Sequence, residues 1–579
     1  MLSKIFALAL LASCTASTAA GPAGPPATAT ATAGAPAYES ATVTVYRDSA
    51  TGAVTTAPGL DSSGTAWGTF TDGEGQPSNF GSLSLQSSAK AADADQMYAL
   101  GYAEGVLTQR RVYQEAVNLR PVVLVHYGKL PSTDPKDFPK ITAFFDENEA
   151  YVRKQSAAPE HAGSKFWRGV GLVLAQYDGL VAGYAHAAPA NETLAKFDFQ
   201  MLNGVGDLFD VIPAVMPELR RDFGSMSSDD LRQYIFESGR CSGLVKVTGD
   251  LSDLFFSHAS WWSYASMIRM MKHYSTPLSA ASGAAARKVS FSSYPGFLES
   301  LDDFYMADSG LQMIQTTNNL FNTSLYDLVK PQSVLAWMRV RVAQMMASTG
   351  KEWHALMAEQ NSGTYENQYM VVDLKLFEPG QPLKPNTLWV GEQIPGTYVS
   401  ADKTDELARG YWPSYNVPYF KEIYDKSGYP AVVAKEGPTS SYELAPRAKI
   451  FRRDQASVVD MASFKKIMRY NDYQHDPYSD GNPDDAICAR GDLSPTRASA
   501  GGCLDCKVSS YKQALRLESE VVNGPTSTFS SGGPGQKPFS WTEAAAFANM
   551  SHVGMPDKFD FVFQTIKPSW TPDASRNAP

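Results

Sequence analysis

The sequence predicts an α+β fold in which two layers of strands are covered by helices. Strand-like alternation of apolar and polar residues marks Thr42–Tyr46 and Ser82–Gln86, and further strand candidates follow residue 241. Helix-like periodicity dominates from about residue 94 to Leu219. Hydrophobic residues make up 43% of the 579 residues and charged residues 19%, as in globular proteins with more than one core-forming unit. Strands and helices in this mixture pack most simply as layers.

The first residues have the pattern of a secretory signal peptide, which we predict at residues 1–20. Lys4 is followed by the apolar run Ile5–Ala12 and then by small residues. This run is shorter than the roughly 20 apolar residues that span a bilayer, so we expect no transmembrane segment. Residues 21–37 read as a low-complexity linker rich in Gly, Pro, Ala and Thr. The protein is therefore expected to be secreted or lysosomal.

Residues 38–219 form a predicted N-terminal fragment that packs on a catalytic unit. Within it, the apolar periodicity predicts a helix over Ala94–Arg120. Residues 220–240 are a predicted processing linker, because the stretch is rich in Ser and Asp and poor in core residues. Such exposed polar segments are preferred sites of proteolysis.

Residues 241–579 are the predicted catalytic fragment. It opens with a hairpin candidate, Leu244–Val247 and Leu254–His258 around a polar turn. Ser260 is expected to cap a helix over Trp261–Tyr274. A buried helix is expected later in the fragment, at Val334–Ser348. Further strands are expected at Val289–Ser293, Leu311–Gln315, Gln368–Leu376 and Leu388–Gln393.

Charge and histidine pattern argue against several classes of function. The net charge of −10 gives a surface that does not attract polyanions, so no nucleic-acid partner is expected. The eight histidines are scattered, and Cys503-Leu-Asp-Cys506 has only half of a zinc pattern, so no metal and no cofactor are expected. Three glycosylation sequons, which suit an exported protein, begin at Asn191, Asn322 and Asn549.

The five cysteines are unevenly placed along the chain. Cys14 leaves with the signal peptide. Cys488, Cys503 and Cys506 cluster, and in an oxidising compartment they can form one bridge, for which Cys488–Cys503 is our choice. Cys241 stands alone. A solitary thiol in an exported protein is either a buried core residue or a reactive group.

Two kinds of nucleophile chemistry suit Cys241. Gly239-Arg-Cys-Ser-Gly243 fits a thiol version of the nucleophile elbow of α/β-hydrolases, but an elbow needs a strand before the nucleophile and a helix after it. Here a polar stretch precedes Cys241 and a strand follows. This order favours an N-terminal nucleophile whose own α-amino group, with a reference pKa of about 7.7–8.0, takes the thiol proton. The peptide bond between Arg240 and Cys241 must then be cut.

Several long blocks of the sequence resemble the phospholipase B-like family, over roughly residues 90 to 570. The blocks are LNGVGDLFDVIPAV from Leu202, CSGLVKVTGDLSDLFFSHASWWSYASMIRMMKHY from Cys241, SSYPGFLESLDDFYMADSGLQMIQTTN from Ser292, NSGTYENQYMVVDLK from Asn361, GYWPSYNVPYF from Gly410, PRAKIFRRDQ from Pro446 and IMRYNDYQHDPYS from Ile467. The resemblance implies an N-terminal-nucleophile hydrolase with an αββα sandwich and additional helical regions. It also implies self-cleavage before Cys241, with the two fragments remaining associated. The family is expected to have a further cysteine where Ala489 follows Cys488, so the local disulfide pattern stays open.

The resemblance also implies other candidate site residues. His258 ends the second hairpin strand and is expected to lie across from Cys241, where it would orient the thiol or bind substrate. Asn416 is our first choice for the side chain that stabilises the oxyanion, as in related cysteine amidohydrolases, with Asn361 and Asn367 as competitors. The remaining candidates for substrate contact are Trp261, Thr317 and, as a partner for an anionic group, Arg447. Each of them also has a purely structural interpretation.

The expected activity is therefore hydrolysis through a thioester on Cys241. The resemblance implies release of fatty acyl groups from phospholipids. The same chemistry cleaves N-acyl amides, so an amidase is the alternative, and a secreted or lysosomal binding protein with weak catalysis is a further one. The sequence leaves open the acyl chain, the head group, whether cleavage before Cys241 is autocatalytic, and the oligomeric state, a homodimer included.

Overall fold

A computed structural model describes residues 40–238, 241–528, 536–544, 547 and 549–570. The predicted signal peptide, the linker at 21–37 and Arg240 of the predicted cleavage bond lie outside these residues. Cys241 and the other candidate site residues lie inside them.

The larger sheet joins residues from before and after the predicted cleavage point. In the described part of the chain it has 11 strands in the order β14-β13-β12-β11-β10-β9-β8-β4-β3-β1-β2. Neighbours pair antiparallel, except that β4 and β8 run parallel. Because β1–β4 precede residue 240 and β8–β14 follow it, cutting there would leave one continuous sheet. The bounds are β1 Ala41–Arg47, β2 Val54–Pro58, β3 Ala66–Thr71, β4 Phe80–Ser87, β8 Arg269–Ser275, β9 Lys288–Ser293, β10 Phe304–Ala307, β11 Leu311–Thr317, β12 Asn367–Asp373, β13 Leu388–Ile394 and β14 Thr397–Asp402.

A second sheet packs face to face on the first. Over the described residues its order is β15-β5-β6-β17-β18-β21. Val245 and Phe256 from this sheet share one buried apolar cluster with Ile314 and Met370 from the larger sheet. The bounds are β5 Ser242–Val247, β6 Leu254–Ala259, β15 Tyr411–Ser414, β17 Asp505–Ser510, β18 Ser519–Asn523 and β21 Gln564–Ile566, with two small pairs, β7 Trp261–Ser263 with β16 Gly501–Cys503 and β19 Phe539–Ser540 with β20 Lys558–Phe559.

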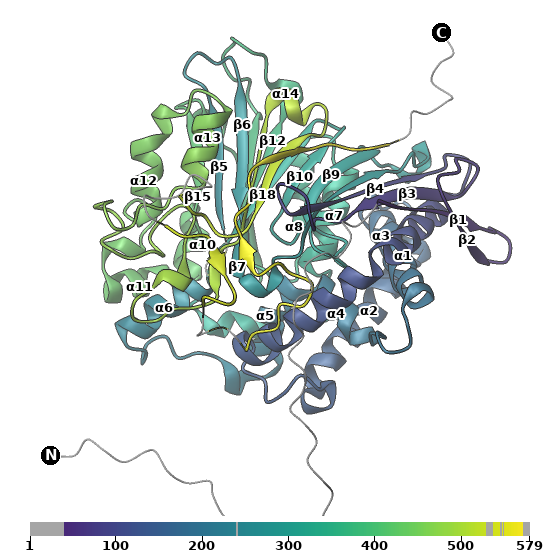
Figure 1. Cartoon of the computed structure of the whole chain (residues 1–579), viewed down its shortest axis with the longest axis horizontal. Helices are drawn as coiled ribbons and strands as arrows, with labels where there is room; N and C mark the ends of the chain where they lie inside the picture. Colours follow the sequence, from purple (N-terminus) through teal and green to yellow (C-terminus); the bar gives the residue numbers. More distant parts are fainter. Residues whose placement is uncertain (1–39, 239–240, 529–535, 545–546, 548, 571–579) are drawn as a thin grey trace, which may run out of the picture. The chain divides into compact units, whose positions relative to one another are not determined.

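Helices cover the outer face of each sheet (Figure 1). On the larger sheet, Leu100 and Leu180 pack with Leu85 and Met313, and on the smaller sheet Ile450 and Phe464 pack with strand residues of β5 and β6. The result is a helix–sheet–sheet–helix arrangement. The bounds are α1 Asp93–Arg120, α2 Pro139–Ser156, α3 Lys165–Ala187, α4 Lys196–Asn203, α5 Val205–Val215, α6 Ser228–Ser238, α7 Ala336–Met346, α8 Gly350–Ala358, α9 Thr404–Leu407, α10 Lys421–Lys426, α11 Tyr429–Glu436, α12 Pro446–Asp454, α13 Met461–Met468 and α14 Tyr511–Ala514.

The predicted α+β class is confirmed, and so are several of the predicted elements. The helix expected over Ala94–Arg120 is α1, and the buried helix expected at Val334–Ser348 is α7. The hairpin that follows Cys241 is β5 and β6, paired antiparallel. The four later strand predictions correspond to β9, β11, β12 and β13.

The helix predicted over Trp261–Tyr274 is wrong. Residues 261–263 form β7, a short turn follows, and Arg269–Ser275 is the strand β8. β8 lies between β4 and β9 in the larger sheet and is buried on both faces, with Met270 under the helices and Met271 between the sheets. A strand buried on both faces has no period-two alternation, so its apolar run cannot be told from a buried helix. Ser260 caps no helix, and its hydroxyl donates to Asp302.

The processing linker predicted at 220–240 is more ordered than its composition suggests. Its second half is the helix α6, which begins where the Asp230 amide donates to the Ser227 hydroxyl at 3.1 Å. Leu231 of this helix is fully buried. The pattern Ser227-Ser-Asp-Asp230 before an apolar residue is the capping arrangement that could have revealed this helix.

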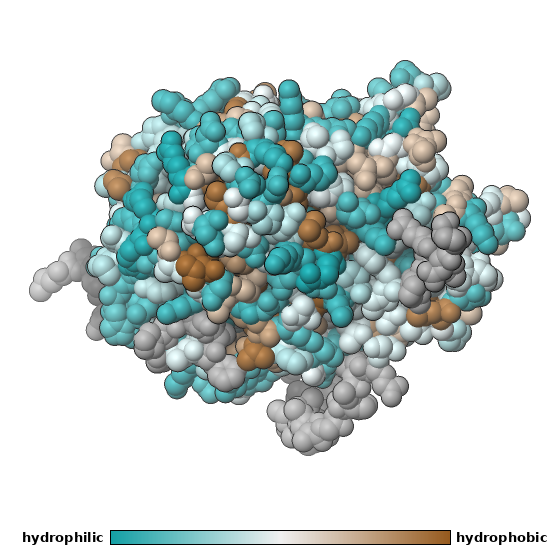
Figure 2. Space-filling model, turned by 90° about the horizontal axis from the view of Figure 1, so that it is seen from above, coloured by the Kyte–Doolittle hydropathy of each residue, from teal (hydrophilic) through white to brown (hydrophobic). Residues whose placement is uncertain are grey.

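The surface of the molecule is largely hydrophilic on the face seen in Figure 2, where apolar residues form small separate patches. Within the described residues, no helix is long and apolar enough to cross a membrane. An apolar substrate therefore has no extended open surface to bind on this face.

Candidate active site around Cys241

Cys241 lies immediately before the first residue of β5 and is 2% exposed. Its φ is 126°, in a region that non-glycine residues adopt only under strain, of about 1–3 kcal/mol. Burial raises the pKa of the thiol far above its ordinary value, while a backbone hydrogen bond from Trp261 and the charge of Lys507 act in the opposite direction. The sulfur is therefore held as a neutral thiol at a strained position at the start of a strand.

Arg447, from α12, connects Cys241 to Asn416. Its Nη1 donates to the Cys241 carbonyl oxygen at 2.7 Å and to the Ser242 hydroxyl at 3.2 Å. Its Nη2 donates to Asn416 Oδ1 at 2.7 Å. Burial lowers the pKa of Arg447 to about 10, so the guanidinium stays charged at physiological pH. One cation thus fixes both the Cys241 backbone and the side-chain amide of Asn416.

Asn416 is buried in a left-handed turn with φ 68°, a conformation that Asn adopts more readily than most residues. Its Nδ2 donates to the Thr317 carbonyl oxygen at 2.5 Å, and its own carbonyl accepts from the Tyr429 hydroxyl at 2.9 Å. An amide nitrogen has two N–H groups, so Asn416 has a second donor besides the one used on Thr317.

The two threonines at the end of β11 have different surroundings. Ile314 belongs to the cluster between the sheets and Met313 to the cluster under the helices, so alternation turns Thr316 toward the smaller sheet. There its hydroxyl is 2.7 Å from the Ser414 hydroxyl, and its methyl group is one of the atoms that a Cβ at Gly243 would meet. Thr317, the residue named from the sequence, contributes its backbone carbonyl to the site.

His258 lies directly across from Gly243 in the pairing of β5 with β6, two residues along from Cys241 on the same face. Its Nδ1 is 3.1 Å from the Lys507 ammonium, which can only donate, so the ring proton is on Nε2. Burial, and then the charge of Lys507, hold the pKa of His258 well below its ordinary value. The ring is therefore a neutral donor rather than a general base.

A buried cluster of charges surrounds His258 between the sheets. Asp302 accepts from Lys507 and, at 2.6 Å, from Arg269, and Asp505 pairs with the same two cations at 2.8 Å each. Burial acts to raise the pKa of Asp302, but the two cations more than offset it and hold the pKa low. Two carboxylates against two cations make a balanced cluster, which sets the electrostatic field at the thiol.

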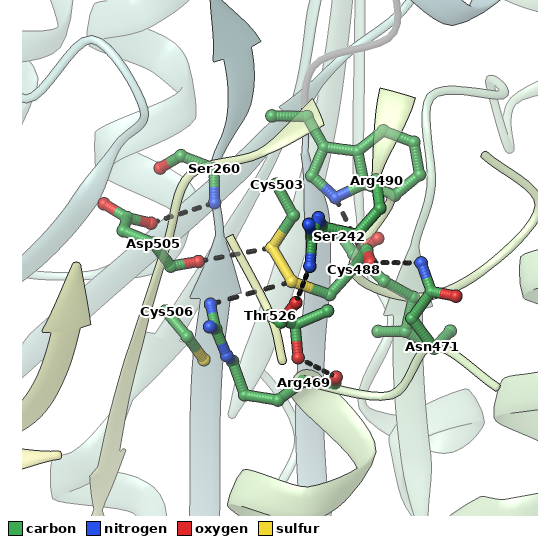
Figure 3. Close-up of a disulfide and its surroundings, with 12 residues drawn as sticks. Ser242, Ser260, Arg469, Asn471, Cys488, Arg490, Cys503, Asp505, Cys506 and Thr526 are labelled. Atoms are coloured by element: carbon green, nitrogen blue, oxygen red, sulfur yellow. Dashed lines mark hydrogen bonds between the residues drawn. A yellow bond between two sulfur atoms is a disulfide. The ribbon is translucent and has the colours of Figure 1, made fainter. Parts of the chain in front are cut away.

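Trp261 forms a wall of the site, and a disulfide supports it. The Arg447 guanidinium lies over the Trp261 ring, 4.1 Å from its centre, and the indole N–H donates to the Ile487 carbonyl at 3.2 Å. Trp261 pairs in register with Cys503, which is bonded to Cys488 (Figure 3). This is the disulfide that we chose from the sequence. Cys506 is a free, buried thiol in the next strand.

Asn361 and Asn367, the competing oxyanion candidates, have structural partners. Asn361 donates to the Ile394 carbonyl at 3.3 Å and accepts from the Gly363 amide, which holds a turn. Asn367 lies opposite Thr317 on β12 and donates to the Tyr369 hydroxyl at 3.1 Å. The structure therefore joins Cys241, Asn416, Trp261 and Arg447 in one contact network, and Asn361 does not share in their hydrogen bonds.

The three sequons differ in exposure. Asn191 and Asn549 are exposed, whereas Asn322 is partly buried and its Nδ2 donates to the Lys426 carbonyl at 3.1 Å. Among the residues that the structure describes, no group of three or more His, Cys, Asp and Glu side chains is arranged to hold a metal ion.

Several residues of the site were missed from the sequence. Lys507 and Asp505 alternate with buried Cys506 and Val508, a pattern that normally marks a solvent-facing side of a strand. Here the charged side faces the other sheet. Asn318, directly after β11, is 3% exposed, and neither polar atom of its side chain has a hydrogen-bond partner within the described chain. A buried amide without a partner is unusual and indicates a place for a ligand or water.

Comparison with known proteins identifies the family. The family model described as phospholipase B matches residues 66–566. The chain is 43% identical to "Phospholipase B-like 1" of Rattus norvegicus over 519 residues, covering 88% of this chain and 89% of that protein. It is 41% identical to "Phospholipase B-like 1" of Homo sapiens (88% of each chain) and 41% identical to "Phospholipase B" of Crotalus adamanteus (88% and 89%). The chain belongs to the phospholipase B family.

Proposed function

We propose that this protein is an N-terminal-nucleophile hydrolase that releases fatty acyl groups from phospholipids through Cys241. The observation that carries the proposal is the place of Cys241: a strained residue at the start of β5, with its carbonyl held by Arg447 and, through Arg447, joined to Asn416. The names of the relatives, phospholipase B and phospholipase B-like 1, support the substrate class.

The first step is cleavage of the Arg240–Cys241 bond. The Cys241 sulfur attacks the carbonyl carbon of residue 240, the C–N bond breaks, and the resulting thioester is hydrolysed to leave a free amine on Cys241. The positive φ of Cys241 supports this step, because strain at the scissile bond is relieved when the bond breaks. Export, through the signal peptide at 1–20, and passage to a secreted or lysosomal location are part of the same proposal.

In the mature enzyme the new α-amine takes the thiol proton, and the thiolate attacks the ester carbonyl. The second N–H of Asn416 and nearby backbone amides stabilise the oxyanion, and the alcohol leaves as the thioester forms. Water then releases the fatty acid. The neutral Nε2–H of His258 and the partnerless amide of Asn318 are suited to bind polar groups of the substrate. The two fragments stay together, because both contribute strands to the larger sheet.

A panel of phosphatidylcholine and N-palmitoyl amides tests the proposal. The processed protein should release fatty acid from the phospholipid, and Cys241→Ala should lower turnover at least about 1,000-fold, as expected for loss of a nucleophile. Cys506→Ala, which removes the second free buried thiol of the described residues, is the matched control and should keep its activity. Turnover of the amides alone would show that the protein is an amidase. If neither the phospholipid nor the amides are hydrolysed, the proposed hydrolase activity is refuted and a binding protein is the remaining alternative.

A further inference from the structure

A small apolar surface lies under the segment that precedes Cys241. We call it the covered surface and define it as Phe321, Tyr429 and Val432, which are 9%, 3% and 4% exposed. Leu231 of α6 completes the same cluster, and further apolar residues of the segment pack on it: Phe223, Met226, Tyr234 and Ile235. The covered surface is therefore buried in part by the segment 220–238, together with Val417 and Tyr424 of the body.

The segment is held there by contacts at its own edge. Lys435 donates to the carbonyl oxygens of Phe223 and Gly224 at 3.0 and 3.1 Å, and to that of Met226. The Phe223 ring meets the Phe321 ring edge-on, with 5.3 Å between centres. Even so, a cavity of about 580 Å³ remains between segment and body. That volume lies within the range of roughly 300–1,000 Å³ that small-molecule sites occupy.

The covered surface adjoins the proposed oxyanion site. The Tyr429 hydroxyl donates to the Asn416 carbonyl and accepts from the Asn319 amide, each at 2.9 Å. At its other end, the segment places Phe236 with its ring centre 6.4 Å from that of Trp261, which stacks under Arg447. The segment thus follows a path from the covered surface to the wall of the Cys241 site.

We propose that the covered surface binds the acyl chain of the substrate after cleavage, in the place that the segment 220–238 leaves, and thereby selects long chains. This inference rests on the proposed function above. When the segment leaves, the apolar side chains of the covered surface become exposed to water, which is unfavourable. An acyl chain whose carbonyl lies at Cys241 and Asn416 is close enough to cover them. Phe321 and Val432, which line the cavity beside the segment, offer apolar surface to a flexible hydrocarbon.

Chain-length selectivity of the processed protein tests the inference. With acetyl, octanoyl and palmitoyl esters of one alcohol, kcat/KM should rise about threefold to fourfold per added methylene until the surface is filled. Val432→Asn should lower the ratio of palmitoyl to acetyl kcat/KM by at least about tenfold. Val459→Asn, the same change at a valine that is 69% exposed, is the matched control and should keep the wild-type ratio. An unchanged ratio in Val432→Asn overturns the inference, and Val432→Met, which keeps the site apolar, should retain the preference.

Binding of a fluorescent palmitate analogue separates this inference from the proposed function. The processed protein should bind the probe at least about tenfold more tightly than uncleaved Cys241→Ala, whose surface stays covered. If the processed protein binds the probe and hydrolyses no ester, the proposed function fails and the covered surface stands. Equal binding of the probe by the two proteins would overturn the inference. A processed protein that dimerises without binding the probe would also overturn it, because the covered surface would then bind a second copy of the chain.

Discussion

The strand after Cys241 and the segment before it are held in opposite ways. Every residue of β5 is buried, and the strand pairs with β6 on one side and β15 on the other. In α6, by contrast, Leu231 is the buried residue, and the helix is held by packing on the covered surface. The boundary between the two lies at the predicted cleavage bond. Removing the segment therefore costs surface contacts and leaves the sheet intact, which is what a chain that matures by cleavage requires.

The largest effect on stability should come from the buried charge cluster of Lys507, Asp302 and Asp505. Lys507→Met removes one of two cations that neutralise Asp302 and Asp505, and breaking a buried pair in this way costs about 3–5 kcal/mol. The urea midpoint should fall accordingly, and cleavage before Cys241 should fail with it. Lys512→Met, at an exposed lysine five residues on, is the control. A urea midpoint equal to that of Lys512→Met would show that the buried charge cluster does not stabilise the fold around β5.

Glu392 should make the unfolding free energy of the protein depend on pH. It is fully buried on β13 and accepts from the backbone amides of Tyr419 and Phe420, close to β15. Burial raises its pKa from 4.5 to about 7, so the folded protein binds the proton more tightly than the unfolded chain does. Its contribution, up to about 3 kcal/mol, is fully present below pH 4.5 and is lost as pH rises through 7.

Glu392→Gln tests this pH dependence. Because the amide does not ionise, the unfolding free energy of the variant should change less than that of the wild type between pH 4.5 and 7.5, as measured by urea unfolding. Parallel pH profiles for the two proteins would contradict the assignment.

Arg447→Ala should have an intermediate effect that falls on chemistry more than on folding. It removes charge-assisted hydrogen bonds to the Cys241 carbonyl and Asn416, worth about 1.5–3 kcal/mol, so cleavage and kcat should fall about 10- to 100-fold. Arg452→Ala on the same helix, whose arginine pairs with exposed Glu443, should behave as the wild type. Equal rates of cleavage and turnover for Arg447→Ala and Arg452→Ala would show that Arg447 does not position Cys241 or Asn416.

The smallest effect should come from the contacts that hold the segment 220–238 on the body. Lys435→Ala removes the donors to three carbonyls of the segment near residue 224, an exposed contact worth about 1 kcal/mol or less. Amide hydrogen exchange in residues 222–238 should speed up, while β5 keeps its protection. Faster exchange in β5 as well would mean that segment and strand open together, and the contrast between them would be lost.

The sequence predicted the fold better than it predicted the surroundings of Cys241. α1 was readable from its apolar periodicity, and the hairpin of β5 and β6 from the polar turn between two β-like runs, although every residue of both strands is buried. β8 is buried as well, but no such turn marks its start, and its apolar run was assigned to a helix. Asn416 and Arg447 were named from resemblance, but their link to each other arises from the folding of α12 beside the turn at Asn416. Lys507 and Asp302 lie 205 residues apart in sequence, and no local pattern brings them together.

Our proposal requires that Cys241 becomes a chain terminus. N-terminal sequencing and intact mass of the two fragments from mature protein measure this directly. We expect Cys241 to be the first residue of the larger fragment and the Cys241→Ala chain to be uncut. An active wild-type chain in which residue 240 is still joined to Cys241 would contradict it.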